Sequence, residues 1–412
     1  MKYGCIGEKL KHSFSKEIHN ALSDYEYEIR EIPRGELDAF MREADFLGIN
    51  VTIPYKELVI PYLDFIDEHA KMIGAVNTIV KRDGKLYGYN TDFSGMTALI
   101  RHLGIEIAGK RVAILGTGGT SKTASAVCSA LSAAEIIVVS RNAGDGHIDY
   151  DELYARHTDV EVIINTTPLG MFPNNYTKPV ELSRFPALLG VVDAVYNPLR
   201  TPLVSEGIER GIPAIGGLYM LVSQAVSASE IFLDKKYADS VCDGVFKKIE
   251  REKENVVLIG MPASGKSTVA EILKAKLCRD KYDTDELIVE RCGASIPEIF
   301  KGRGEAYFRE VENEVALDVA KISSAVIATG GGIILNPENI RALRQNGRVY
   351  FIDRPLSELV PTASRPLSSD RASIEKRYAE RYDIYRASAD VIIDADCDAE
   401  TVATKIMEDF LN

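Results

Sequence analysis

The segment GMPASGKST at residues 260–268 constrains this chain more than any other feature. It follows the apolar run of residues 255–259 and precedes a helical pattern that reaches Leu277. In a glycine-rich loop with this spacing, successive backbone N–H groups point into one concavity at a helix N-terminus and bind phosphate there. Lys266 would then reach the β- and γ-phosphates, and the Ser267 hydroxyl a magnesium ion. The sequence therefore predicts a nucleotide site built from a strand, a loop and a helix.

The nucleotide site explains only the last part of the chain, because 259 of the 412 residues precede its loop. One hydrophobic core rarely serves so many residues, so two or three domains are expected. The net charge of −12 opposes a phosphate backbone and excludes nucleic acid as the expected partner. No apolar stretch reaches the length of a membrane span, and the six cysteines lack CxxC spacing. We expect a reduced, cytoplasmic protein that does not contact membranes. The sequence leaves its oligomeric state open.

Short apolar runs alternate with helical patterns along the whole chain, which is typical of parallel α/β sheets. Residues 1–100 are expected to form one α/β lobe, to which a helix at about 213–245 returns. That lobe includes a hairpin at 76–89, because Asp83-Gly84 is a strong two-residue turn signal. Residues 101–212 are expected to form a doubly wound sheet.

The boundary to the last domain is predicted at residues 246–254, where nearly every residue is charged. A helical pattern that runs from about 217 to 247 leads into this segment, which we interpret as a linker. The alternation of strands and helices then resumes over 255–412.

A second glycine-rich turn, GTGGTS at 116–121, follows the apolar run of residues 111–115. Such glycines let a dinucleotide pyrophosphate approach the N-terminus of the next helix, although similar turns also serve packing alone. The next strand ends in Ser140-Arg141, where an NAD site usually has Asp or Glu. A cation at this position suits a 2′-phosphate, so the sequence favours NADP over NAD.

Polar residues gather at the turns of the first lobe. Ser13 and Ser15 precede a helix, where Ser15 could also serve as its N-cap. The segment Asn50-Val-Thr-Ile-Pro-Tyr-Lys56 ends an apolar strand, and Asp92 follows the hairpin. If Lys56 and Asp92 meet at the strand ends, they would form a proton-transfer pair.

These segments resemble the shikimate dehydrogenase family over nearly all of residues 1–245. Seven motifs occur in the family's order, at residues 12–20, 49–56, 74–79, 88–92, 165–171, 193–198 and 217–225. The resemblance implies that Lys56 is the catalytic acid/base, paired with Asp92. It implies that the substrate's carboxylate and hydroxyls are held by Ser13, Ser15, Thr52, Asn77, Asp92 and Gln224, with Tyr196 on the substrate side. The implied cofactor residues are Gly116, Gly118, Gly119, Thr120, Ser140, Arg141, Asn165 and Thr166.

Residues 255–412 resemble shikimate kinase. The resemblance implies Asp285 for the substrate hydroxyl, Arg365 as an arginine on a mobile lid, and Ser267 with Asp283 for magnesium. The implied nucleotide residues are Gly260, Ala263, Ser264, Gly265, Lys266, Ser267 and Thr268, and the implied substrate residues are Arg309, Gly331, Gly332 and Arg381. The sequence departs from the family at Ala263, where glycine is common, and in residues 354–370, which are short for a lid.

Together the resemblances imply a bifunctional α/β enzyme, a two-lobe dehydrogenase with a Rossmann NADP lobe followed by a P-loop kinase. NADPH would reduce 3-dehydroshikimate to shikimate, and ATP with Mg²⁺ would phosphorylate shikimate to shikimate 3-phosphate. One alternative is a quinate/shikimate dehydrogenase fused to another small-metabolite P-loop kinase. Another is a nucleotide-binding protein with one degenerate site. The retention of Lys56, Asp92, Lys266, Asp283 and Asp285 argues against the last alternative.

Overall fold

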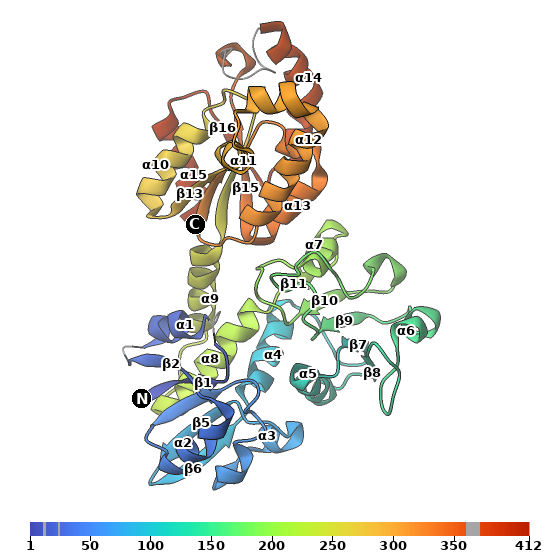
Figure 1. Ribbon diagram of the computed structural model, residues 1–412. Coiled ribbons are helices and arrows are strands. Elements are labelled where there is room, and N and C mark those ends of the chain that lie inside the picture. Colours follow the sequence, from blue (N-terminus) through green and yellow to red (C-terminus); the bar gives the residue numbers. More distant parts are fainter. Residues whose placement is uncertain (11–13, 24, 360–370, 412) are drawn as a thin grey trace. The chain divides into compact units, whose positions relative to one another are not determined.

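The computed structural model describes residues 1–10, 14–23, 25–359 and 371–411. The chain divides into two compact units, Met1–Glu250 and Arg251–Asn412. The first unit contains a six-stranded and a five-stranded sheet, and the second contains another five-stranded sheet (Figure 1). Among the described residues, no helix has both the length and the apolar character that crossing a bilayer requires.

The six-stranded sheet forms the first lobe of the first unit. Its strand order is β2-β1-β3-β5-β6-β4, with β1 (Tyr3–Gly7), β2 (Tyr27–Glu31), β3 (Gly48–Val51), β4 (Phe65–Ile66), β5 (Thr78–Arg82) and β6 (Lys85–Tyr89). Strands β1, β2 and β3 are parallel, whereas β5 and β6 form an antiparallel hairpin. Asp83 and Gly84 both have positive φ, as the predicted two-residue turn requires. The helices of this lobe are α1 (Ser15–Leu22), α2 (Leu37–Glu43) and α3 (Glu68–Ile73).

The second lobe is a parallel sheet with the strand order β11-β10-β9-β7-β8. Its strands are β7 (Arg111–Leu115), β8 (Glu135–Val139), β9 (Val162–Asn165), β10 (Gly190–Asp193) and β11 (Ala214–Ile215), and its helices are α5 (Gly119–Ala130), α6 (Tyr150–Arg156) and α7 (Pro202–Glu209). The chain passes from β7 to β8 on one side and then returns to β9 on the other. Ligands of such sheets bind outside the carboxyl ends of the strands at this reversal. The doubly wound fold expected for this part of the chain is confirmed.

Two long helices, α4 (Thr91–His102) and α8 (Leu218–Leu233), lie side by side where the lobes of the first unit meet (Figure 1). Their backbones approach closely because residue 95 is glycine: a Cβ there would lie 2.7 Å from the carbonyl oxygen of Met220. The Ser94 hydroxyl donates a hydrogen bond of 2.9 Å to Ser227. The N-terminus of α4 is therefore held firmly against α8.

The predicted helix from about 217 to 247 is wrong in one respect, because it is two helices. Helix α8 ends at Leu233, where Asp234 adopts a left-handed conformation with φ of 50°, and α9 spans Ser240–Lys253. The charged segment 246–254, interpreted as a linker, is mostly the end of α9. Its Lys, Glu and Arg residues favour helix, and Val245 and Ile249 are buried against apolar residues of α1 and α8.

The second unit is built on a fully parallel sheet with the order β13-β14-β12-β15-β16. Its strands are β12 (Asn255–Ile259), β13 (Asp280–Asp283), β14 (Ala325–Ala328), β15 (Gly347–Asp353) and β16 (Val391–Asp394). Its helices are α10 (Lys266–Leu277), α11 (Thr284–Cys292), α12 (Ile296–Val319), α13 (Pro337–Asn346), α14 (Arg371–Ser388) and α15 (Ala399–Leu411). Strand β12 is buried on both faces, because Val257 and Ile259 face one core and Val256 and Leu258 the other.

Candidate active sites

Lys56 and Asp92 meet between the lobes of the first unit. Lys56 follows β3, and Asp92 is the second residue of α4. The distance from Lys56 Nζ to Asp92 Oδ2 is 2.6 Å, and the two side chains are 28% and 19% exposed. Because the pair is partly buried, its attraction is weakened less than it would be in bulk water. The exposed part of the two side chains remains open to a ligand. The sequence predicted this juxtaposition, and the structure shows it.

The residues predicted to hold the substrate lie around this pair. Asn77 immediately precedes β5, and its Oδ1 accepts a 2.7 Å hydrogen bond from the backbone N–H of Thr91. Gln224 Oε1, on α8, lies 3.4 Å from the Thr91 hydroxyl. Thr52 follows β3, and its N–H donates to Ile6.

Two more predicted substrate residues, Ser15 and Tyr196, come from different lobes of the first unit. Ser15 is the first residue of α1. Tyr196 follows β10, and its ring packs against Phe14 with the centroids 5.3 Å apart. The structure thus brings Tyr196 next to the start of α1. Ser13 lies outside the described residues.

The glycine turn after β7 is shaped for a ligand. Gly116 has φ of 108°, and a Cβ there would lie 2.8 Å from Thr166 Oγ1, so packing alone requires this glycine. Gly118 is the N-cap of α5 and Gly119 its first residue. A Cβ added at either position would meet nothing within 4 Å. This open space at a helix N-terminus, followed by Thr120, fits a dinucleotide pyrophosphate.

Arg141 lies just beyond the end of β8, one residue after Ser140. The Ser140 N–H donates to the carbonyl of Ile148 and closes the loop behind them. Arg141 is exposed and makes no hydrogen bond or ion pair with any other residue that the structure describes. Its guanidinium is available to a ligand phosphate.

Asn165 was predicted to contact the cofactor, and the structure corrects this interpretation. The side chain is completely buried. Its Nδ2 donates to Asp193 Oδ1 and to the carbonyl of Leu169, and its Oδ1 accepts from both the N–H and the hydroxyl of Thr167. Burial raises the pKa of Asp193 to about 7. Because its amide is used inside the protein, Asn165 shapes the cleft wall and does not reach a ligand.

In the second unit, the loop after β12 wraps around the Lys266 side chain. Lys266 Nζ donates to the carbonyls of Gly260 (2.7 Å) and Met261 (2.9 Å). Gly260, Ala263 and Gly265 all have positive φ. The Ser264 hydroxyl is buried and has no hydrogen-bond partner among the residues that the structure describes. An unpaired buried hydroxyl is costly, and a phosphate oxygen would satisfy it, so the loop fits a nucleotide phosphate.

Ser267 and Asp283, both predicted for magnesium, are in contact. Ser267 Oγ donates to Asp283 Oδ2 at 2.8 Å, and Asp283 Oδ1 accepts from the N–H of Asp285. In the described part of the chain, no three His, Cys, Asp or Glu side chains lie close enough together to hold a metal. Mg²⁺ usually takes only one or two protein oxygens and completes its shell with phosphates and water. The Ser267–Asp283 pair fits that ion, and Thr268 follows in the first turn of α10.

The glycines after β14 bring the backbone against the remaining predicted residues. A Cβ at Gly330 would collide with Asp285 Oδ1, and one at Gly332 with the guanidinium of Arg309. The carbonyl of Gly331 accepts hydrogen bonds from Arg381 Nη1 (3.0 Å) and from the Tyr385 hydroxyl (2.6 Å). The structure therefore gathers Asp285, Arg309 and Arg381 around one glycine segment. Arg365 lies outside the described residues.

Glu312, for which the sequence predicted no role, also lies inside this group. The side chain is 2% exposed, and its Oε2 accepts from Arg309 Nη1 at 2.7 Å. Its Oε1 has no hydrogen-bond partner within the described ranges, and burial raises the pKa of the carboxyl. The three-residue spacing between Arg309 and Glu312 on one helix was the available signal. Glu312 holds the Arg309 guanidinium beside the glycines.

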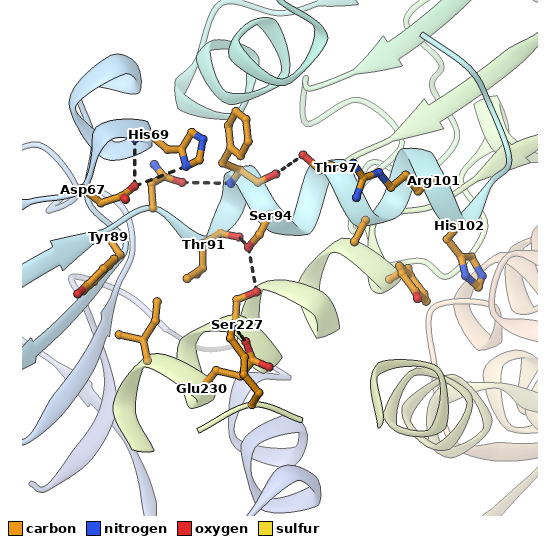
Figure 2. A pocket seen from close by; sticks show the side chains of 16 residues that line it. Asp67, His69, Tyr89, Thr91, Ser94, Thr97, Arg101, His102, Ser227 and Glu230 are labelled. Carbon is orange, nitrogen blue, oxygen red and sulfur yellow. Dashed lines mark hydrogen bonds and ion pairs between the residues drawn. The ribbon is translucent and has the colours of Figure 1, made fainter. Parts of the chain in front are cut away.

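A separate cavity of about 670 Å³ lies along α4 and α8 (Figure 2). Figure 2 shows Ser94 and Ser227 meeting across it, with His69 near one end and His102 near the other. Thr91 lines the cavity, but Lys56 and Asp92 do not. The proton-transfer pair therefore lies outside this cavity.

These features define two classes of enzyme in one chain. A Lys–Asp pair beside a glycine turn for a dinucleotide is the arrangement of a nicotinamide-dependent oxidoreductase. A strand, phosphate loop and helix with a Ser–Asp magnesium pair is the arrangement of a P-loop kinase.

Comparisons with known proteins assign both classes to families. The model of the shikimate dehydrogenase substrate binding domain matches residues 5–79, and that of shikimate kinase matches residues 262–411. Shikimate dehydrogenase (NADP(+)) of Clostridium beijerinckii is 36% identical over 265 residues, covering 61% of this chain and 98% of that protein.

Two solved structures are also similar. A chorismate mutase/shikimate 5-dehydrogenase fusion protein from Clostridium acetobutylicum is 35% identical, with a TM-score of 0.57 over 60% of this chain and 96% of that one. Shikimate 5-dehydrogenase from Thermus thermophilus, solved with NADP(H) and shikimate, is 25% identical, with a TM-score of 0.54 over 60% of this chain and 99% of that one. The chain therefore belongs to the shikimate dehydrogenase family through its first unit, and its second unit carries a shikimate kinase domain.

The left-handed conformation of Ala263 (φ 68°) leads to a stability prediction. An L-residue with a Cβ pays about 1–2 kcal/mol there, whereas glycine does not. Ala263→Gly should stabilise the second unit by about 0.5–1 kcal/mol after the greater chain entropy of glycine is counted. Differential scanning calorimetry measures this change.

Ala275→Gly, on the exposed face of α10, is the matched control and should destabilise by about 1 kcal/mol. If Ala263→Gly lowered the stability by a similar amount, the loop strain inferred here would be contradicted.

Proposed function

We propose that this chain catalyses two consecutive reactions. The first unit reduces 3-dehydroshikimate to shikimate with NADPH, and the second phosphorylates shikimate to shikimate 3-phosphate with ATP and Mg²⁺. The observation that carries the proposal is that each unit has its own nucleotide turn and its own reactive group. The 2.6 Å Lys56–Asp92 pair serves the first unit, and the loop around Lys266 serves the second. The product of the first reaction is the substrate of the second.

In the first reaction, Lys56 donates the proton that the ketone oxygen needs. Bound NADPH supplies the hydride. Asp92 accepts a hydrogen bond from the Lys56 ammonium and so fixes its direction toward the substrate. Asn77 and Gln224, linked through Thr91, face the substrate hydroxyls.

The carboxylate of that substrate requires donors at the other end of the site. We assign Ser15 and Thr52 to it, together with Ser13, and Tyr196 to the wall beside them. These side chains are hydroxyls without charge, so they hold the carboxylate by hydrogen bonds.

In the second reaction, the chain mainly positions groups and neutralises charge, as phosphoryl transfer requires. Bound ATP with Mg²⁺ supplies the phosphoryl group. Lys266 gives up its bonds to Gly260 and Met261 to reach the phosphates. Asp285 accepts the proton of the attacking hydroxyl, and Arg309 and Arg381 pair with the substrate carboxylate, a geometry that suits the planar guanidinium.

Two further assignments complete the proposal. We propose Arg365 as a cation over the transferred phosphoryl group. We also propose a cytoplasmic location, which the six free cysteines support.

Substitution of each reactive lysine in the full chain tests the proposal. Lys56→Ala should lower the rate of 3-dehydroshikimate reduction by about 100-fold or more, because a positioned acid contributes about 10²–10⁴-fold. Phosphorylation of added shikimate should stay within about twofold. Lys266→Ala should show the reverse pattern, and Lys71→Ala, an exposed lysine of α3, should change neither rate. Loss of both activities in a folded Lys56→Ala or Lys266→Ala variant would contradict two independent sites.

Arg141→Ala tests the choice of cofactor. A charge-assisted hydrogen bond contributes about 1.5–3 kcal/mol, so kcat/KM for NADPH should fall by about 10- to 100-fold. NADH lacks the 2′-phosphate, and its kcat/KM should change less than threefold. The matched control is Arg156→Ala in the same lobe, where Arg156 is exposed and pairs with Glu152. Equal losses for NADPH and NADH would remove the assignment.

A further inference from the structure

The backbone N–H of Thr91 orients the side-chain amide of Asn77, which the proposed function places against the substrate. Thr91 is the first residue of α4, and its N–H lacks a partner within the helix. That N–H donates to Asn77 Oδ1 at 2.7 Å. An amide nitrogen cannot accept a hydrogen bond, so the oxygen of Asn77 must face α4. The two N–H groups of Asn77 Nδ2 then face the other way, and they make no hydrogen bond to another described residue.

A chain of hydrogen bonds between buried side chains of β2, β3 and β5 reinforces this orientation. The Tyr27 hydroxyl donates to Asn50 Oδ1 at 2.7 Å, which leaves Asn50 Nδ2 to donate to Thr78 Oγ1 at 3.0 Å. Because Thr78 Oγ1 accepts this bond, its own proton is directed toward Asn77 Oδ1 at 3.1 Å or Thr91 Oγ1 at 3.1 Å. The first two bonds therefore run from the phenol to Thr78, and the Thr78 proton continues to Asn77 either directly or through Thr91, whose Oγ1 lies 3.2 Å from Asn77 Oδ1.

The environment of Tyr27 keeps it a donor. Tyr27 is 1% exposed, and its ring stacks on His19 with the centroids 3.9 Å apart. Burial raises the pKa of Tyr27 well above its ordinary value, so the phenol keeps its proton. Asn50 and Thr78 are buried as well, which makes a broken bond in this chain costly.

We propose that Tyr27, Asn50 and Thr78 are positioning residues that present Asn77 to the substrate as a hydrogen-bond donor. This inference rests on the proposed dehydrogenase function. It restricts the substrate group opposite Asn77 to an acceptor, such as a hydroxyl or ketone oxygen. It excludes a group that can only donate, such as an ammonium.

A double-mutant cycle on the full chain tests the proposal. Tyr27→Phe removes only the phenolic oxygen and should lower kcat/KM for shikimate oxidation by about three- to tenfold, mostly through KM. If Tyr27 acts through Asn77, the same substitution in an Asn77→Ala background should cost less than about 1.5-fold. Tyr62→Phe is the control, because the Tyr62 hydroxyl of the same lobe donates to Asp38 and touches neither Tyr27 nor Asn50. It should leave KM for shikimate unchanged.

Two further measurements keep the test decisive. If the Asn77→Ala background turns over too slowly, calorimetric titration with shikimate gives the same cycle from Kd. Thr78→Ser keeps the hydroxyl and should leave KM for shikimate unchanged. Thr78→Val removes the hydroxyl from the same buried position and should raise KM. The affinity of each variant for NADPH, whose proposed site is elsewhere in the same unit, reports whether the first unit is folded.

Equal losses from Tyr27→Phe in both backgrounds, or equal effects of Thr78→Ser and Thr78→Val, would overturn the positioning role. An inactive parent chain with 3-dehydroshikimate and NADPH would instead contradict the proposed function itself.

Discussion

Both candidate sites depend on one constraint, the unpaired N–H groups at the N-terminus of a helix that follows a strand. The chain uses these groups in two ways. In α4 and α11, side chains of Asn90 and Asp283 cap the first turn, so those helices position Asp92 and Asp285 for a substrate. In α5 and α10, the N-cap residues are Gly118 and Gly265, which have no side chain to cap the helix. Those two N-termini fit phosphate.

Positively charged side chains lie near the two helix N-termini that fit phosphate. The chain as a whole carries a net charge of −12, which would repel anionic ligands. Cations nevertheless lie close to the proposed anion sites: Arg141 follows β8, the strand next to the one that leads into the dinucleotide turn, and Lys266 lies inside the phosphate loop. The ion pair with Glu312 fixes the Arg309 guanidinium without a bound substrate. Local charge, and not net charge, selects the ligand.

The local parts of this arrangement could be predicted from the sequence. Strand β12, the glycine loop and α10 are contiguous, and the turn at Asp83-Gly84 needs only two residues. The alternation of apolar runs also predicted the α/β class, because buried parallel strands are apolar throughout. Lys56 and Asp92 are 36 residues apart, and only the order of the family's motifs predicted their contact.

What the sequence did not predict depends on long-range partners or on a single backbone residue. The bond from Tyr27 to Asn50 joins neighbours in space without any periodic pattern. The role of Asn165 depends on Asp193, which is contributed by a different strand. The break after α8 begins at Asp234, which adopts a left-handed conformation, and the chain becomes helical again only at Ser240.

The most direct measurement of the central claim follows one labelled hydride through both units. The full chain is supplied with 3-dehydroshikimate, ATP, Mg²⁺ and NADPH that carries deuterium at its transferable position, and the products are analysed by mass spectrometry. The account predicts shikimate 3-phosphate that carries one deuterium. Deuterated shikimate that remains unphosphorylated, or NADPH consumption without deuterium in either product, would contradict it.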